Sequence, residues 1–464
     1  MKIFVLLFDG VGIRNFAYSG FFRFAVEQGH QVIFWNGTEF PVNEKLGLPE
    51  LKLPAPEPHK FAGLAKDIKQ KAEIKYHYKK TKDKAYLTAI RKNLKNLDPK
   101  QRLKHYFTGF VSGLFASHKG RLFLERRLQK TARSTPYYQA VLKQLDKHKP
   151  DIILSSHQRP VQALEPVLAA QDLGIPTAGF IFSWDNLPKA TLQIKTDYYL
   201  VWSEYMKNEL LYYYPEIRTE QIFITGTPQF EIHYQTELKM PREDFFKWIG
   251  LPPERKYIVF SGDDVRTSPN DDIYLSHLCK AVRKYNSEKK ENVHIIFRPV
   301  PVDFSSRYEW VEEDYTDVLT RVQPLWQKID DNWTNYFPTP DDGKMLTNLA
   351  EHTEGVFNIG SSMVFDFVAH EKPTVYFNYE TDLTKDVNWW AKDIYNLIHF
   401  RSMPSSRAVL WAREKSGLTG ILDKILMKNY DLSETKKWFD IINTPPQDKA
   451  SERIIRSLEK IVGT

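Results

Sequence analysis

The residue pattern that most directly predicts chemistry is a strand, a turn of small residues and a helix within residues 354–379. A short apolar run ends at Gly360, and Ser361 and Ser362 follow where the helix should begin. The unpaired N–H groups and positive dipole end of such a helix suit a phosphate, to which the two hydroxyls would add donors. Asp366 lies further along the helix. The alternative is that one serine only caps the helix.

Three more residues in this half of the chain follow predicted strands or open a predicted helix. Gly262 comes directly after the apolar run 256–261, and Arg298 comes directly after 294–297. Asp342 stands just before the next predicted helix. A permanent cation and a helix N-terminus at one sheet edge could hold a diphosphate without a metal ion. The alternatives are a surface ion pair for Arg298 and helix capping for Asp342.

The first half of the chain offers two candidates for a general base. Asp9 follows the first predicted strand, and His157 follows another strand predicted over residues 152–156. An imidazole titrates near neutral pH, whereas Asp9 would need its pKa raised by a dry pocket. A turn cap and an inert loop histidine are the alternatives. Six further polar residues follow strands or line loops at the same predicted edge: Arg14, Asn15, Ser19, Asp185, Asn186 and Lys189.

The elements that must position these residues alternate between strand and helix, first over residues 3–225 and again over residues 256–377. This alternation predicts the α/β class, with two Rossmann-like domains that face a cleft where a ligand would bind. We expect an N-terminal domain over residues 1–235 and a C-terminal domain over residues 243–445. A helix over residues 446–464 is expected to cross back to the first domain.

Length and composition limit the class of protein. A chain of 464 residues with 42% hydrophobic and 14% aromatic residues can build two domain cores. It contains no run of 18 or more apolar residues, so we expect no transmembrane helix. The apolar N-terminus is interrupted by Asp9 and predicts a strand rather than a signal peptide. The single cysteine, Cys279, excludes an intramolecular disulfide, and a cytoplasmic location is expected.

The net charge of +7 is unevenly distributed. Residues 60–133 contain 21 Lys and Arg against 5 Asp and Glu, a local balance of +16, whereas the rest of the chain carries −9. We therefore expect a basic helical insert over about residues 60–135 in the first domain. Its expected partner is an anionic membrane surface, and nucleic acid is not expected because no nucleic-acid motif accompanies the charge.

The insert also contains an amphipathic helix pattern, since apolar residues recur at helical spacing over residues 103–115. The stripe consists of Leu103, Tyr106, Phe107, Phe110, Val111, Leu114 and Phe115. It could enter the boundary of a lipid bilayer, as expected for a protein attached to the inner face of the cell membrane. The alternative is that the stripe packs against its own domain.

Several blocks of the sequence resemble a known family. Residues 358–362, with Asp366 and the Lys372–Pro373 pair, resemble the C-terminal half of GT-B nucleotide-sugar glycosyltransferases. The Ser-Ser-x-x-x-Asp spacing is similar to that of CDP-glycerol glycerophosphotransferases and related surface-polysaccharide enzymes. A second resemblance runs through three blocks of the first half, residues 183–189, 201–206 and 225–230. Together the blocks extend the resemblance over nearly the whole chain, apart from roughly residues 60–133.

The resemblance implies that the serines lie beside the diphosphate of a nucleotide-sugar donor in the C-terminal domain and that the N-terminal domain binds the acceptor. It implies a transferase of surface-polysaccharide synthesis, such as that of lipopolysaccharide or capsule, with a lipid-linked or saccharide acceptor. No cofactor or metal ion is expected. Glycerophosphotransferases usually carry an Arg-x-His-Pro run, but this chain has Arg298 followed by Pro299 and Val300. The missing histidine favours glycosyl transfer.

Other functions stay open as alternatives: a CDP-glycerol-type phosphotransferase, a nucleotide-sugar epimerase with the same fold, or a non-catalytic membrane-associated scaffold. The sequence contains no Walker A motif, no HExxH, no CxxC zinc spacing and no Gly-x-Ser-x-Gly elbow. A run of Gly10, Val11 and Gly12 lacks the third glycine of a nicotinamide-binding fingerprint.

Overall fold

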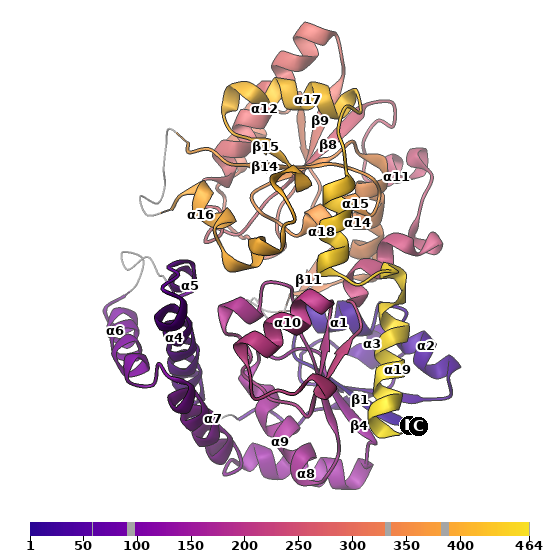
Figure 1. The fold of residues 1–464 in the computed structure, drawn as a ribbon. Coiled ribbons are helices and arrows are strands. Elements are labelled where there is room, and N and C mark those ends of the chain that lie inside the picture. The colour runs from indigo at the N-terminus through magenta and orange to yellow at the C-terminus, as the bar shows by residue number, and fades with distance from the viewer. Residues whose placement is uncertain (58, 91–97, 330–335, 382–388, 464) are drawn as a thin grey trace. The chain divides into compact units, whose positions relative to one another are not determined.

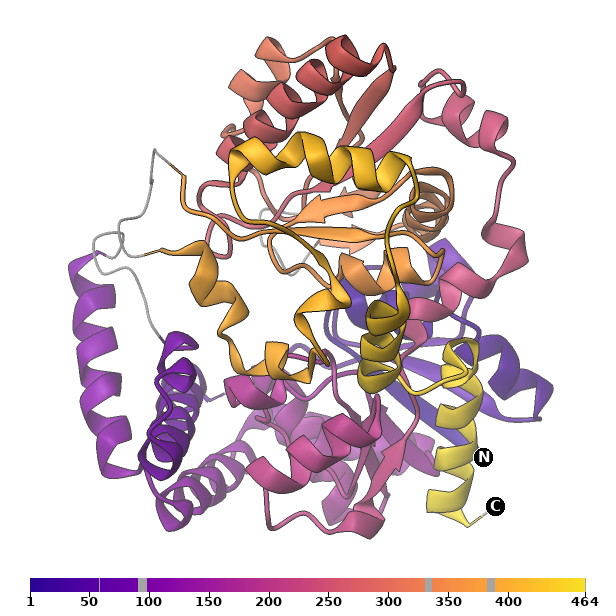
Figure 2. The same cartoon turned by 45° about the horizontal axis from the view of Figure 1, so that its top comes forward.

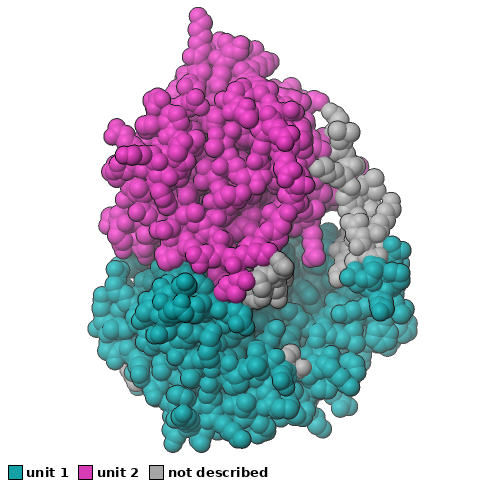
Figure 3. All heavy atoms as spheres, turned by 180° about the vertical axis from the view of Figure 1, so that it is seen from behind, with its two compact units in different colours: residues 1–229, 397–399, 442–464 teal, residues 230–396, 400–441 magenta. Residues whose placement is uncertain are grey.

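The computed structural model describes residues 1–57, 59–90, 98–329, 336–381 and 389–463. The chain forms two compact units, which are coloured separately in Figure 3. Unit 1 comprises residues 1–229, 397–399 and 442–464, and unit 2 comprises residues 230–396 and 400–441. The C-terminal segment therefore belongs to the same unit as the N-terminal half of the chain.

Unit 1 contains a seven-stranded sheet in the order β3-β2-β1-β4-β5-β6-β7, and every neighbouring pair is parallel. Parallel sheets carry helices on both faces, which explains why β1 reads as a continuous apolar run, buried from Ile3 to Leu7. The strands are β1 (Lys2–Leu7), β2 (Gln31–Asn36), β3 (Glu50–Lys52), β4 (Ile152–Ser155), β5 (Thr177–Phe180), β6 (Tyr198–Val201) and β7 (Ile222–Ile224).

Helices cover this sheet, and their apolar faces form its core (Figure 1). Val141 and Val167, for example, pack into one buried cluster with Phe4 and Ile153 of the sheet. The C-terminal helix α19 packs beside α2, where Nε2 of His30 lies 2.8 Å from a carboxylate oxygen of Glu459. The helices are α1 (Gly10–Phe16), α2 (Phe21–Glu27), α3 (Val42–Leu46), α8 (Pro136–His148), α9 (Leu164–Asp172), α10 (Glu204–Tyr213) and α19 (Ala450–Val462).

The predicted basic helical insert is present between β3 and α8, although residues 91–97 within it lie outside the described residues. Some of its cations are used inside unit 1. Arg121, only 1% exposed, lies 2.7 Å from Glu216, and Nζ of Lys69 donates to the carbonyl of Leu192 at 2.6 Å. The insert is therefore anchored by buried charge. Its helices are α4 (Ala62–Thr81), α5 (Ala85–Thr88), α6 (Pro99–Leu114) and α7 (His118–Ala132).

Unit 2 contains a six-stranded sheet in the order β10-β9-β8-β13-β14-β15, again with parallel neighbours, and a separate antiparallel ribbon of β11 and β12. Its strands are β8 (Lys256–Ser261), β9 (Val293–Arg298), β10 (Leu319–Arg321), β13 (Val356–Asn358), β14 (Thr374–Phe377) and β15 (Leu410–Ala412). The ribbon strands are β11 (Trp326–Lys328) and β12 (Tyr336–Pro338).

The helices of unit 2 cover both faces of its sheet (Figure 2). They bury an extended cluster that includes Phe260, Leu278, Phe297 and Phe377. The helix predicted to begin just after Asp342 begins earlier, at Pro340. The helices are α11 (Arg242–Trp248), α12 (Asp271–Lys289), α13 (Glu309–Asp314), α14 (Pro340–His352), α15 (Met363–Val368), α16 (Ala391–Tyr395), α17 (Leu418–Leu426) and α18 (Ser433–Ile442).

Both units thus have the parallel α/β architecture that the sequence predicts. Across the described residues, no helix has both the length and the apolar character needed to cross a membrane.

One buried acid of unit 1 makes the stability of the fold depend on pH. Glu165 in α9 is 2% exposed, and burial raises its pKa from 4.5 to about 7. The folded state therefore holds this proton more tightly than the unfolded state does, so stability falls as pH rises from about 4.5 to about 7. Glu165→Gln removes this loss. We expect the variant to gain up to about 3 kcal/mol over the wild type between pH 4.5 and pH 8 in urea unfolding.

Candidate functional site

In each unit the strand order reverses at one point, between β1 and β4 in unit 1 and between β8 and β13 in unit 2. Ligands of open parallel sheets bind beside such reversals, at the carboxyl ends of the strands. The predicted site residues Asp9 and His157 follow β1 and β4. Gly262 and Gly360 follow β8 and β13. Each unit therefore presents sequence-predicted candidates at its own reversal point.

In unit 1 this arrangement brings Asp9 and His157 into contact. Nε2 of His157 lies 2.8 Å from Oδ2 of Asp9, and the side chains are only 7% and 16% exposed. Nδ1 of His157 accepts a hydrogen bond from the amide N–H of Arg159 at 3.1 Å, which assigns the ring proton to Nε2. Oδ1 of Asp9 accepts from the amide of Gly12 at 2.8 Å, so the aspartate also caps α1.

The pKa of Asp9 is lowered, so Asp9 lacks the raised value that it would need in order to act as the base. Burial would raise the pKa, but the charge and hydrogen bond of His157, with help from the Gly12 amide and Arg159, outweigh burial. An ionised Asp9 is a poor base, but it can orient the imidazole and stabilise the imidazolium. Nδ1, the other ring nitrogen of His157, carries the lone pair that the Arg159 amide engages.

Three other predicted residues of unit 1 lie on or just after α1. Asn15 is 1% exposed, and its Nδ2 has no hydrogen-bond partner among the described residues, which leaves a buried donor beside the site. Nε of Arg14 donates to Oδ1 of Asn15 at 3.4 Å. The hydroxyl of Ser19 donates to the carbonyl of Asn15 at 2.7 Å and accepts from the amide of Phe21. Ser19 therefore stabilises the turn between α1 and α2.

The loop after β5 holds the remaining predicted residues of unit 1, and their side chains bond mainly to one another. Lys189 forms an ion pair with Asp185, and Nδ2 of Asn186 donates to Oδ1 of Asp185 at 2.8 Å. Oδ1 of Asn186 accepts from Nε2 of Gln158 at 3.0 Å, and Gln158 directly follows His157. Asn186 thus acts as a turn residue, which the sequence allowed. Gln158, which the sequence did not single out, joins this loop to the His157 loop.

In unit 2 the Gly360 turn has the geometry that a small residue requires. Gly360 has φ +68°, and a Cβ there would lie 2.9 Å from side-chain atoms of Ile394 and Phe400. The hydroxyl of Ser361 accepts from the amide of Met363 at 3.4 Å. Ser362 occupies the N-cap position but makes no side-chain cap bond, so the capping alternative does not explain its hydroxyl. Helix α15 is only a six-residue helix, which weakens the predicted dipole contribution.

Arg298 and Asp342, both predicted to contact a donor, are paired with each other. Nη2 of Arg298 lies 2.9 Å from Oδ1 of Asp342, and both side chains are 8% exposed. Burial would raise the pKa of Asp342, but Arg298 and the N–H groups of Leu325 and Trp326 lower it. Asp342 is thus a buried ion-pair partner within α14 and not the helix cap, which is Thr339. Nη1 of Arg298 keeps no partner among the described residues and stays available to an anion.

Within unit 2, Gly262 has a role in packing and Asp366 has a role in a hydrogen-bond network. A Cβ at Gly262 would lie 3.0 Å from both the Phe297 ring and the Tyr308 hydroxyl, so any other residue would force these neighbours to shift by a few tenths of an ångström. Oδ1 of Asp366 lies 2.8 Å from Nε2 of His233. The other ring nitrogen of His233, Nδ1, lies 3.0 Å from Nε2 of His370. The structure therefore places Asp366 in a buried histidine network.

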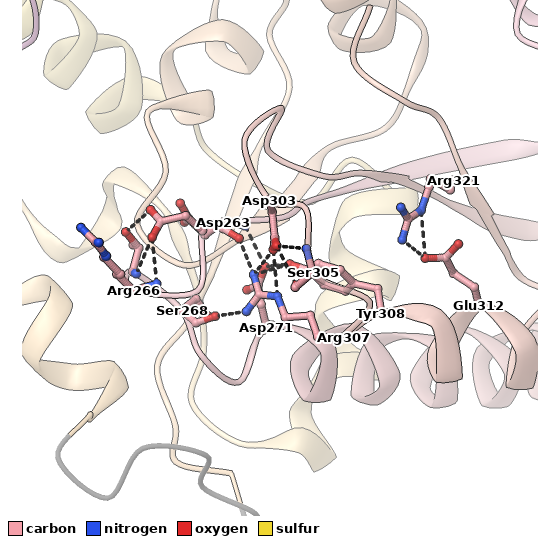
Figure 4. Close-up of polar contacts among 12 residues, drawn as sticks. Asp263, Arg266, Ser268, Asp271, Asp303, Ser305, Arg307, Tyr308, Glu312 and Arg321 are labelled. Carbon is pink, nitrogen blue, oxygen red and sulfur yellow. Dashed lines mark hydrogen bonds and ion pairs between the residues drawn. The ribbon is translucent and has the colours of Figure 1, made fainter. Parts of the chain in front are cut away.

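A polar cluster in unit 2 was missed by the sequence analysis (Figure 4). The amide of Asp263 and the hydroxyl of Tyr308 both donate to Oδ2 of Asp271 at 2.8 Å. Arg307 donates to the carbonyl of Asp263 and, at 2.9 Å, to Asp303. Burial and the charge of Asp271 raise the pKa of Asp263 well above its usual value. Asp263, the second residue after β8, can thus donate a proton, and no sequence signal links it to Arg307, which is distant in the chain.

The described ranges contain no group of three or more His, Cys, Asp or Glu side chains that could hold a metal ion.

No protein-family model matches the chain, and no curated protein matches it. Several solved structures do match the chain. UDP-GlcNAc 2-epimerase from Neisseria meningitidis, bound to UDP-GlcNAc, matches over 99% of this chain and 100% of its own, with TM-score 0.56 and 11% identity. UDP-GlcNAc 2-epimerase from Methanocaldococcus jannaschii matches over 99% and 100%, with TM-score 0.53 and 14% identity. A glycosyltransferase from Rickettsia africae matches over 99% and 97%, with TM-score 0.50 and 9% identity.

At these identities the similarity shows the fold. The predicted fold class is confirmed, because the two parallel-sheet units match the GT-B-like fold of nucleotide-sugar enzymes along nearly the whole chain. The narrower resemblance to CDP-glycerol glycerophosphotransferases stays a prediction.

The buried Arg298–Asp342 pair leads to a prediction about stability and binding. Arg298→Ala leaves a buried carboxylate without its cation, and we expect a loss of about 3–5 kcal/mol in the free energy of unfolding. The double variant Arg298→Met/Asp342→Asn removes both charges and should regain most of that loss in urea unfolding. If nucleotide binding is as tight in the double variant as in the wild type, Arg298 has only a structural role.

Ser362→Ala measures anion binding in unit 2 without the loss of stability expected for Arg298→Ala, because the hydroxyl of Ser362 makes no cap bond. We expect stability within about 0.5 kcal/mol of the wild type. Affinity for a nucleoside diphosphate should fall roughly tenfold by calorimetry, as for a lost hydrogen bond to a charged group. Ser361→Ala is the matched control for the same turn, since its hydroxyl already accepts from Met363. Equal loss in both variants would contradict a specific role for Ser362.

Proposed function

We propose that this protein is an enzyme that acts on a nucleotide sugar and that the His157–Asp9 pair transfers a proton in its reaction. The observation that carries the proposal is this pair, 2.8 Å apart at the strand ends where the order of the seven-stranded sheet reverses. The lowered pKa of Asp9 fits a carboxylate that stays ionised while it orients and stabilises the histidine. The nucleotide-sugar class is supported by the solved neighbours, one of which binds UDP-GlcNAc.

Unit 2 supplies groups suited to the diphosphate. Nη1 of Arg298 has no partner among the described residues, and Ser362 makes no cap bond. The raised pKa of Asp263 keeps a proton available for an anionic leaving group. Hydrogen-bond donors of this kind can replace a divalent cation, and the proposal therefore includes no obligatory metal ion.

Epimerisation at C2 of the sugar, which the sequence left as an alternative, is the reaction that the comparisons favour. The two neighbours with the higher TM-scores among those described above are UDP-GlcNAc 2-epimerases. Inversion at C2 breaks the C2–H bond, and its electron pair forms a C1–C2 double bond as the C1–O bond to the diphosphate breaks. The diphosphate oxygen then bonds to C1 again while the double-bond pair takes a proton at C2 on the opposite face. A base must therefore take the C2 proton. We assign this role to Nδ1 of His157, because Nε2 of the same ring faces the carboxylate of Asp9 and Nδ1 is the ring nitrogen that accepts hydrogen bonds.

Glycosyl transfer to a lipid-linked or saccharide acceptor is the second candidate. It is favoured by the motif resemblance of residues 358–366 and by the Rickettsia africae glycosyltransferase of the same fold. In this reaction His157 would take the proton of the acceptor hydroxyl as that oxygen forms its bond to the anomeric carbon and the nucleotide leaves.

One experiment distinguishes the two reactions. The protein is incubated with UDP-GlcNAc in D₂O containing EDTA, without an acceptor, and followed by NMR. An epimerase forms the C2 epimer and incorporates deuterium at C2. A transferase leaves C2 unlabelled and releases UDP in step with glycoside formation only when a saccharide acceptor is added. If neither reaction occurs and calorimetry detects no binding across UDP, GDP, CDP and TDP sugars, the nucleotide-sugar proposal is wrong and the scaffold alternative gains.

The dyad is tested in whichever reaction is found. His157→Ala and Asp9→Asn should each lower turnover by about 10²–10⁴-fold, because one removes the base and the other its ionised partner. Nucleotide affinity, measured by calorimetry, should stay within about twofold of the wild type for both. Near-normal turnover in both variants would leave Asp9 as a helix cap only.

A further inference from the structure

Helix α6 of the insert exposes its apolar side and buries its polar side, which is the reverse of an ordinary amphipathic helix. Its apolar residues point outward: Leu103, Tyr106, Phe107, Phe110 and Leu114 are 72%, 61%, 51%, 73% and 69% exposed. Its buried residues are the polar Thr108 and Ser112, both 0% exposed. A helix that covers its own domain buries the apolar side instead. The predicted alternative, that the stripe packs against its own domain, therefore does not hold for these five residues.

Polar contacts explain why α6 adopts this orientation. Figures 1 and 2 show α6 on the side of α4 that faces away from the sheet of unit 1. Nζ of Lys71, a 3% exposed residue of α4, donates to Oγ1 of Thr108 at 2.5 Å, and Lys75 donates to the carbonyl of Gly109. These bonds satisfy the buried polar atoms between the two helices. Rotation of α6 to bury its phenylalanines would break them and leave the Lys71 cation buried without them.

The exposed charged residues of the insert are mainly cations, even when its buried cations are left out of the count. Lys69, Lys71 and Arg121 are buried and contribute nothing to the surface. Other cations of the insert are exposed, among them Lys100 and Lys104 on α6 itself. The remaining exposed cations of α4 and α7 are Lys79, Lys80, Lys119, Arg126, Arg127 and Lys130.

We propose that the outward apolar face of α6, together with the lysines beside it, attaches the protein to an anionic lipid bilayer. Aromatic and aliphatic side chains enter the acyl boundary while lysines meet lipid phosphates, as in interfacial amphipathic helices. The inference is independent of the reaction, since none of these residues belongs to the candidate sites of either unit.

Charge complementarity selects the bilayer over other occupants of the face. A second copy would bring the exposed cations of α4, α6 and α7 against those of its partner, which disfavours association through this face. Nucleic acid would match the charge but not the five exposed apolar side chains, because its backbone is polar and charged. An anionic bilayer satisfies both the charge and the apolar surface.

The main test is sedimentation of the full chain with phosphatidylcholine vesicles, with and without phosphatidylserine. We expect binding only to the anionic vesicles, with a component that weakens from about 0.1 M to about 1 M salt as the screening length shortens. Lys100→Gln/Lys104→Gln/Lys119→Gln should lower binding about fivefold per charge, on the order of 100-fold in total. The matched control neutralises three exposed lysines of unit 2, Lys247, Lys280 and Lys284, and should bind as the wild type does.

Phe110→Ser/Leu114→Ser tests the apolar contribution and should lower the salt-resistant binding on the order of 100-fold or more. Because both side chains are exposed, the melting temperature should stay that of the wild type. Leu173→Ser/Met427→Ser, which changes two exposed apolar residues elsewhere (42% and 62% exposed), should leave vesicle binding unchanged.

A probe at position 110 reports on insertion directly. The chain's single cysteine, Cys279, is buried and its pKa is raised, so a thiol introduced by Phe110→Cys can be labelled selectively. The emission of an attached environment-sensitive fluorophore should shift to the blue with anionic vesicles and not with neutral ones. A Met427→Cys label should not respond.

Three results would overturn the inference. Equal binding of the wild type to neutral and anionic vesicles would remove the role of charge. Unfolding of Phe110→Ser/Leu114→Ser would place the stripe in the core. A wild-type dimer that becomes a monomer in this variant by analytical ultracentrifugation, with no vesicle binding, would assign the face to a second copy.

Discussion

The constraint on which the rest of the structure depends is the burial of two parallel sheets on both faces. Helices cover each sheet, so strand residues such as Ile3 to Leu7 must be apolar, and polar side chains are accommodated where the strands end. Because parallel strands all end at the same edge, loops that are distant in sequence meet there. The reversals of strand order, β1 beside β4 and β8 beside β13, then decide which loops are neighbours.

The buried aspartates at these two sheet edges have pKa shifts of opposite sign. At Asp9 the partner is a histidine and the pKa falls, whereas at Asp263 the neighbours are other aspartates and the pKa rises. Burial raises the pKa in both cases, so the difference comes from the neighbouring charge. One edge thus offers an ionised carboxylate that supports a base, and the other offers a protonated acid.

The basic insert divides its charge between the interior and the surface of unit 1. Arg121 and Lys69 are buried and bind Glu216 and the carbonyl of Leu192, which fixes the insert to the sheet domain. The same polar packing, through Lys71 and Thr108, leaves the apolar side of α6 outside. Because polar contacts hold α6 to α4, the apolar surface of α6 is left for a partner.

The sequence by itself determined the class and order of the elements, because periodicity and turn residues act over a few positions. It also identified residues that follow strands, such as His157 and Gly360. Only the tertiary structure decided which of them meet: Asp9 with His157, Arg298 with Asp342, and Asp366 with His233. It likewise decided that the α6 stripe faces outward. These outcomes depend on contacts between distant segments, and helical or strand periodicity shows which residues share a face but not what that face contacts.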